Sequence, residues 1–133
     1  MVNPGVAYKD PIAEKIAYEA YISDYFERRA NGFRGQRIGQ CITGARLFLG
    51  ITSSIISGYA RNVPTNSTVP KIGAIVKTAE SQAGHVAVVI KISGDSIEIF
   101  ESNGSAGYEL AGTRWLKINN PLIVGYLILE GGE

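Results

Sequence analysis

The sequence contains few of the residues that most often carry chemistry: its 133 residues include one cysteine and one histidine. A single cysteine excludes a disulfide within the chain, so the fold does not rely on one and suits a reducing compartment. One cysteine and one histidine cannot fill a zinc site. The longest apolar runs are far shorter than a membrane span, so membrane insertion is not expected.

The chain also lacks an excess of charge of either sign. Thirteen basic and twelve acidic residues leave a formal net charge of +1, which argues against a dominant role in nucleic-acid binding. Residues 1–5 have neither the basic nor the apolar region of a secretory signal, so no signal peptide is expected. The length suits one domain over residues 1–133.

The first half of the chain has the periodicity of helices. Asp10-Pro11 is a helix-start signal, and apolar residues then recur at intervals of three and four, which predicts an amphipathic helix over about 11–30 that ends near Asn31-Gly32. A glycine-rich loop follows. It leads into a second predicted helix over about 40–50, which contains Cys41.

The second half has the pattern of strands. Residues 51–60 are compatible with a short helix or an irregular turn, and 61–71 with an exposed loop. Short β-branched runs separated by turn residues then predict a strand meander over about 72–129. The five expected strands are 72–78, 85–92, 97–101, 114–118 and 123–129. Helices followed by a meander predict an α+β fold, in which N-terminal helices pack against an antiparallel sheet of about five strands.

Cys41 is the first candidate for chemistry because it lies at or near the first turn of its predicted helix. Unpaired backbone amides and the positive end of the helix dipole favour a thiolate there. A lone cysteine is also a common small buried apolar residue. A catalytic role for Cys41 therefore requires a base elsewhere in the chain.

His85 and Glu101 supply that base on two adjacent predicted strands. A turn over 93–96 brings the start of one strand beside the end of the next, so both side chains should lie close together. A carboxylate fixes the orientation of an imidazole, which then accepts a proton from a thiol. Taken alone, His85 is compatible with a structural histidine, and Glu101-Ser102-Asn103 is compatible with a polar strand end. Their combination with the single cysteine favours a site.

Four stretches in a fixed order resemble a known family. They are Gly39-Gln40-Cys41, Val69-Pro70-Lys71-Ile72-Gly73-Ala74-Ile75-Val76, Gly84-His85-Val86-Ala87-Val88-Val89 and Glu101-Ser102-Asn103-Gly104. With the closing Val124-Gly125-Tyr126-Leu127 they resemble the CHAP domain, a cysteine, histidine-dependent amidohydrolase/peptidase with a papain-like fold. The similarity extends over roughly residues 33–129.

The resemblance implies a role for each site residue. Cys41 is the expected nucleophile, His85 the general base and Glu101 the residue that orients the imidazole, with Asn103 in a supporting role. The backbone amide of Cys41 and a nearby glutamine, Gln40 or else Gln36, are expected to stabilise the oxyanion. Some members bind calcium through an acidic loop upstream of the cysteine. That region is rich in arginine and glycine here, so no metal or other cofactor is expected.

The resemblance also implies a substrate and a setting. The expected substrate is an amide bond of bacterial peptidoglycan, cut through a thioester either within the stem or cross-bridge peptide or between muramic acid and L-alanine. The expected protein is a monomeric, phage-encoded bacteriolytic enzyme, either an endolysin or a virion-associated lysin. It would remain in the host cytoplasm until holin release or travel in the virion, with other virion proteins or a larger lysin chain as partners, and act at the cell wall.

Two other functions remain open from the sequence. One is a non-catalytic binding or virion structural module that keeps the fold without the reaction. The other is a toxin-like enzyme with the same site chemistry that hydrolyses a protein amide. Fold alone does not determine the substrate, so the sequence does not choose among these.

Overall fold

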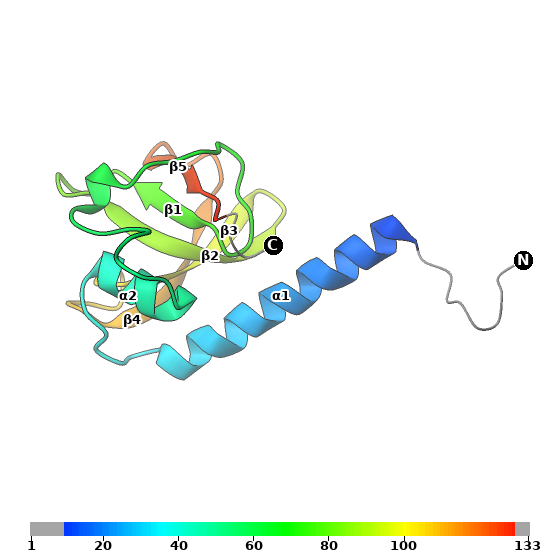
Figure 1. The fold of residues 1–133 in the computed structure, drawn as a ribbon, viewed down its shortest axis with the longest axis horizontal. Helices are drawn as coiled ribbons and strands as arrows, with labels where there is room; N and C mark the ends of the chain where they lie inside the picture. Colours follow the sequence, from blue (N-terminus) through cyan, green and yellow to red (C-terminus); the bar gives the residue numbers. More distant parts are fainter. Residues whose placement is uncertain (1–9, 130–133) are drawn as a thin grey trace, which may run out of the picture.

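The computed structural model describes residues 10–129 as two helices, one short 3-10 turn and five strands (Figure 1). The helices are α1 (Pro11–Phe33) and α2 (Cys41–Leu49), and the 3-10 turn η1 is Ala60–Asn62. The strands are β1 (Ile75–Thr78), β2 (His85–Ser93), β3 (Ser96–Ser102), β4 (Ala111–Lys117) and β5 (Ile123–Leu127). Both helices precede the sheet in sequence, as predicted.

The five strands form one sheet in the order β4-β3-β2-β1-β5, and every neighbouring pair is antiparallel. The β2–β3 hairpin closes with Ser93 opposite Ser96, at the predicted turn. Because both helices pack against this antiparallel sheet, the predicted α+β fold is confirmed.

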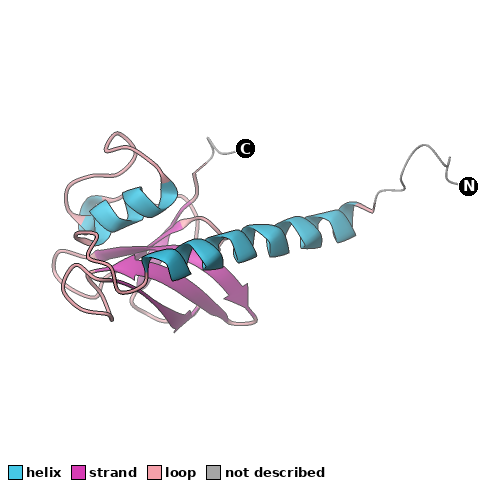
Figure 2. Ribbon diagram, turned by 90° about the horizontal axis from the view of Figure 1, so that it is seen from below, coloured by secondary structure: helices cyan, strands magenta, loops and turns pink. Residues whose placement is uncertain are grey.

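Helix α1 packs on the body of the protein mainly through its C-terminal half, which contains its one buried residue, Ala30. Asp10 caps its start by accepting from the Ile12 amide at 3.0 Å, and Pro11 occupies the first turn as predicted. The N-terminal half extends away from the sheet (Figures 1 and 2). The helix ends at Phe33, beyond the predicted Asn31-Gly32 signal, because Phe33 lies against Phe48 and Phe100 of the core.

An apolar core fills the space between the helices and one face of the sheet. Its centre is a stacked pair of rings, Phe48 of α2 on Phe100 of β3, with centroids 4.1 Å apart. Phe26 and Phe33 of α1 extend this group. Stacked aromatic rings add packing energy to the area that they bury, so this cluster fixes α2 against β3.

The opposite face of the sheet has its own apolar cluster, which includes Val76, Val89, Ile99 and Tyr126. The first strand begins at Ile75 and not at the predicted residue 72, because Gly73, with φ of 90°, forms a turn before it. Residues 51–59 form turns that lead into η1. None of the helices within residues 10–129 has the length and apolar character needed to cross a membrane.

Candidate active site

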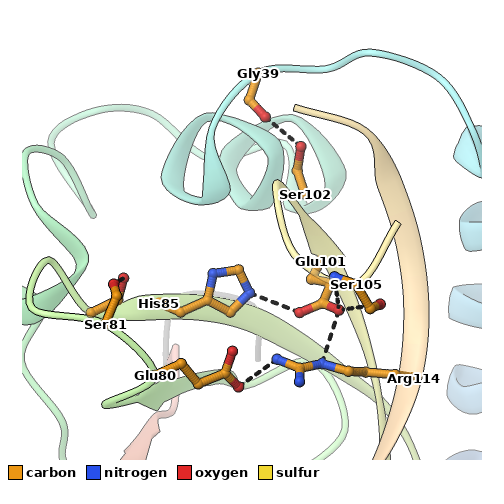
Figure 3. Close-up of polar contacts among 9 residues, drawn as sticks. Gly39, Glu80, Ser81, His85, Glu101, Ser102, Ser105 and Arg114 are labelled. Carbon is orange, nitrogen blue, oxygen red and sulfur yellow. Dashed lines mark hydrogen bonds and ion pairs between the residues drawn. The ribbon is translucent and has the colours of Figure 1, made fainter. Parts of the chain in front are cut away.

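The thiol of Cys41 lies at the first residue of α2. Gly39, with φ of 102°, turns the chain before the helix, and its carbonyl accepts a hydrogen bond from the Ser102 hydroxyl at the end of β3 (Figure 3). A Cβ on Gly44 would lie 2.4 Å from the Cβ of Ser102, so only glycine permits this approach. These contacts hold the start of α2 against the end of β3.

His85 and Glu101 form a buried pair on the two strands of the hairpin. The Nε2–H of His85 donates to Oε1 of Glu101 at 2.8 Å (Figure 3). The strand register explains this contact: Val88 pairs with Phe100, which puts His85 and Glu101 diagonally opposite on one face of the sheet. The structure therefore brings together the two side chains that the hairpin was expected to join.

Glu101 is 1 % exposed as a residue, and its buried carboxylate is surrounded by donors. Ser105 donates to Oε2 from its amide at 3.1 Å and from its hydroxyl at 2.7 Å, and Arg114 Nε lies 2.9 Å from the same oxygen. A Cβ on Gly104 would come within 2.5 Å of this carboxyl. Burial raises the pKa of Glu101, but the hydrogen bonds from His85 and Ser105 and the charge of Arg114 outweigh it and lower the pKa to about 2.

The imidazole of His85 lies between two acidic groups. Burial lowers its pKa, but hydrogen bonds to Cys41 and Glu101, together with their charges, outweigh burial and raise the pKa of His85 to about 9. Because an ionised Glu101 only accepts, it fixes the proton on Nε2 and leaves Nδ1 for Cys41. The site therefore favours an imidazolium near neutral pH.

The thiol of Cys41 is only partly buried. Burial raises its pKa, yet the hydrogen bond to His85, the backbone amides of Val86 and Ile42 and the charge of His85 together lower the pKa below its ordinary value. The Ile42 amide belongs to the first turn of α2, where the sequence predicted stabilisation of an anion. Cys41 and His85 can therefore exist as a thiolate and an imidazolium.

A cleft of about 640 Å³ opens over this pair. Its walls come from the start of α2, the loop before η1, the β1–β2 loop and the loop after β3. Cys41, His85, Gln40 and Asn103 all line it. The cleft gives an extended substrate access to the thiol.

The two glutamines predicted at the oxyanion position are placed differently. Gln40 directly precedes α2, and its side chain makes no capping hydrogen bond to that helix. Gln36 does not line the cleft, and its Nε2 donates to the Gly32 carbonyl in the last turn of α1 at 2.6 Å. The structure therefore leaves Gln40, and not Gln36, beside the thiol.

Asn103 shapes the loop after β3. It has a left-handed backbone, with φ of 63°, and its Oδ1 accepts from the Glu109 amide at 2.8 Å. Asparagine tolerates this conformation better than most residues. Asn103 thus lines the cleft while holding the turn that follows Glu101.

Sequence reasoning missed Ser105, Arg114 and Glu80. Arg114 contacts Glu101 and also forms an ion pair with Glu80 of the β1–β2 loop (Figure 3). Ser105 lies only four residues after Glu101, so a local sequence motif could have indicated its hydrogen bond to the carboxylate. No local motif could have indicated Arg114, because its position depends on the register of β4 against β3.

Metal ligands are scarce in the part of the chain that the structure describes. Within residues 10–129, no group of three or more histidine, cysteine, aspartate or glutamate side chains is placed to hold a metal ion. The carboxylates of Glu80 and Glu101 are already engaged in ion pairs with Arg114.

Comparisons with known proteins agree with this architecture. A CHAP domain family model matches residues 29–103, more than half of the sequence. The chain belongs to the CHAP domain family. No curated protein sequence matches it.

Two similar solved structures are described as "The crystal structure of Ly7917" and "The crystal structure of Ly7917 with the hydrolyzing product of MDP". The first is 17% identical with a TM-score of 0.56, and the second is 18% identical with a TM-score of 0.59. Each comparison covers 78% of this chain and 61% of the Ly7917 chain, so this chain spans under two thirds of that protein's length. At this identity the likeness establishes a shared fold.

Proposed function

We propose that this protein is a cysteine-dependent hydrolase that cuts an amide bond of bacterial peptidoglycan. The observation that carries the proposal is the Cys41–His85–Glu101 arrangement, in which Cys41 and His85 line a cleft and Glu101 is buried behind His85. Family membership supports an amide-bond hydrolase. The Ly7917 structure described with a hydrolysis product of MDP, a peptidoglycan-derived compound, supports the substrate class.

The first half of the reaction forms a thioester. His85 Nδ1 accepts the proton of Cys41, and the thiolate attacks the amide carbonyl carbon. The negative charge that develops on the carbonyl oxygen is stabilised by the Cys41 backbone amide and the Gln40 side chain. The tetrahedral intermediate then collapses as His85 gives its proton to the departing amine, leaving the acyl group on sulfur.

The second half regenerates the enzyme. His85, now neutral, takes a proton from a water molecule, and the resulting hydroxide attacks the thioester carbonyl. The carboxylic acid product leaves and the sulfur recovers its proton from His85. Throughout, Glu101 holds Nε2–H and keeps Nδ1 directed at sulfur, while Asn103 supports the loop beside it.

A defined peptidoglycan tests this proposal. The purified protein should release muropeptides with a new free amine, and their masses identify the bond as one in the stem, in the cross-bridge, or next to muramic acid. Cys41→Ala should abolish release while the circular dichroism spectrum is retained. Tyr18→Ala, on the exposed half of α1, is the matched control and should remain active. An active Cys41→Ala protein contradicts the mechanism, and cleavage of protein amides alone contradicts the substrate.

We further propose that the protein acts as a monomer in a phage lysin system, as an endolysin or a virion-associated lysin. The family resemblance supports this setting. Expression inside a susceptible host with and without a holin distinguishes the two, because an endolysin needs the holin to reach the wall. Lysis by added particles alone would favour a virion-associated role.

A further inference from the structure

Arg114 connects the buried carboxylate of the site to the wall of the cleft. It lies on β4 opposite Ile99, which puts it on the same face of the sheet as Glu101. Its Nε is 2.9 Å from Oε2 of Glu101, and its Nη2 pairs with Glu80 (Figure 3). Its side chain is 28 % exposed and lines the cleft. One guanidinium thus contacts two carboxylates at once.

Glu101 needs a cation that does not depend on the stage of the reaction. Its side chain has no exposure to solvent, and a buried carboxylate without a counter-charge is strongly destabilised. His85 supplies positive charge only while it is protonated, and the proposed reaction removes and returns that proton. The Arg114 guanidinium remains protonated at every stage.

Two charged or titratable groups contact Glu101 directly, His85 of β2 and Arg114 of β4. Cys41 of α2 interacts with His85, and Glu80 of the β1–β2 loop interacts with Arg114. Arg46 of α2 also lines the cleft but donates to the Ile56 carbonyl at 3.1 Å. Of the two arginines that line the cleft, only Arg114 forms an ion pair with Glu101.

We propose that Arg114 is a positioning residue that keeps Glu101 ionised throughout the reaction and thereby sets the acid limit of the site's working range. Glu80 holds the guanidinium from its other side. The inference rests on the proposed roles of Cys41 and His85. Without Arg114, Glu101 takes up a proton at a higher pH, and as a neutral carboxyl it no longer stabilises the His85 imidazolium or the thiolate–imidazolium pair.

The pH dependence of Cys41 alkylation tests this role without any substrate. The rate of reaction with iodoacetamide reports the thiolate of the chain's only cysteine. In Arg114→Gln the acid limb of this profile should move to higher pH by about one unit, a tenfold loss of rate on that limb. Arg114→Lys keeps the charge and should restore the wild-type limb. The acid limb of peptidoglycan hydrolysis should move in parallel.

The matched control is Arg46→Gln, the same substitution in the same cleft without an ion pair to Glu101. Its acid limb should stay at the wild-type pH. A merely structural role for Arg114 would lower the rate by one factor at every pH, and that result, or equal shifts in both glutamine variants, overturns the inference. If Arg114→Gln does not fold, a displaced limb in Arg114→Lys overturns it.

The alkylation profile also separates this inference from the proposed function. If Cys41→Ala still hydrolyses peptidoglycan, the proposed function fails, yet the profile continues to report whether Arg114 governs the site. If Cys41→Ala is inactive and the profile does not move, the proposed function stands and the role of Arg114 falls.

Discussion

The two helices of this protein lie on the same sheet but are covered very differently. Ile42, Ala45 and Phe48 of α2 are buried, whereas Ile12 and Tyr18 in the first half of α1 are 73 % and 64 % exposed. Apolar periodicity predicted α1, and an apolar stretch of helical length predicted α2. The comparison shows that such a pattern predicts a helix but not how much of it the fold will cover.

The chemistry lies with the covered helix. Helix α2 is fixed by Gly44 against Ser102 near its start and by the Phe48–Phe100 stack near its end, so the Cys41 sulfur is held near His85. A catalytic group needs this kind of rigid support. The first half of α1 has no comparable support and contributes no residue to the cleft. Substitutions in the two regions should therefore differ sharply in their effects.

The largest expected effect follows His85→Ala. Loss of the base and acid should lower kcat/KM for peptidoglycan hydrolysis by about 10²–10⁴. The circular dichroism spectrum should be retained, because a smaller side chain leaves the strand pairing intact. Steady-state kinetics on a defined peptidoglycan measure this effect. A kcat/KM of the variant within a few-fold of the wild-type value would contradict the role of His85 as the base for Cys41.

The next largest effect concerns stability. Phe48→Ala removes a ring that is 1 % exposed from the centre of the core and should lower the free energy of unfolding by about 3–5 kcal/mol. Urea denaturation followed by circular dichroism measures the change. A loss below about 1 kcal/mol would show that α2 is not held by this stack.

The acid side of the stability profile provides a third test. The folded protein lowers the pKa of Glu101 from an ordinary 4.5 to about 2, so its contribution to stability is complete above about pH 4.5 and is lost as the pH falls through about 2. Glu101→Gln should flatten this part of the profile, measured as urea midpoints against pH. On the alkaline side, the raised pKa of His85 makes the stability fall as the pH rises, whereas the lowered pKa of Cys41 makes it increase, so the two contributions oppose each other. An unchanged acid slope in Glu101→Gln would contradict the account.

The smallest effect is expected in the exposed half of α1. Ile16 is 65 % exposed, so Ile16→Ser should change the free energy of unfolding by no more than about 0.5 kcal/mol and leave the hydrolysis rate unchanged. The same urea and kinetic measurements apply. A large loss in either would mean that this half of α1 is covered in solution.

Local signals explain how much of the site could be predicted. The hairpin turn at 93–96 lies within one short stretch of sequence, and it was enough to place His85 beside Glu101. The helix-start position of Cys41 was readable in the same way. Both depend on residues close together in the chain.

The remaining features depend on contacts that no local pattern specifies. The loop between β3 and β4 contains two non-glycine residues with positive φ, Asn103 and Glu109, and the sequence does not fix the register that follows it. Arg114 was missed for that reason. The exposure of α1 and the displacement of Gln36 from the cleft likewise follow from tertiary packing, which residue periodicity does not encode.

The most direct test of the central claim is the titration of Cys41 itself. Since the chain has one cysteine, the difference in ultraviolet absorbance between wild type and Cys41→Ala reports the thiolate of that residue alone. We expect a midpoint below the ordinary thiol value of about 8.5 in the wild type and a higher midpoint in His85→Ala. A wild-type midpoint at or above the ordinary value, unchanged in His85→Ala, would contradict it.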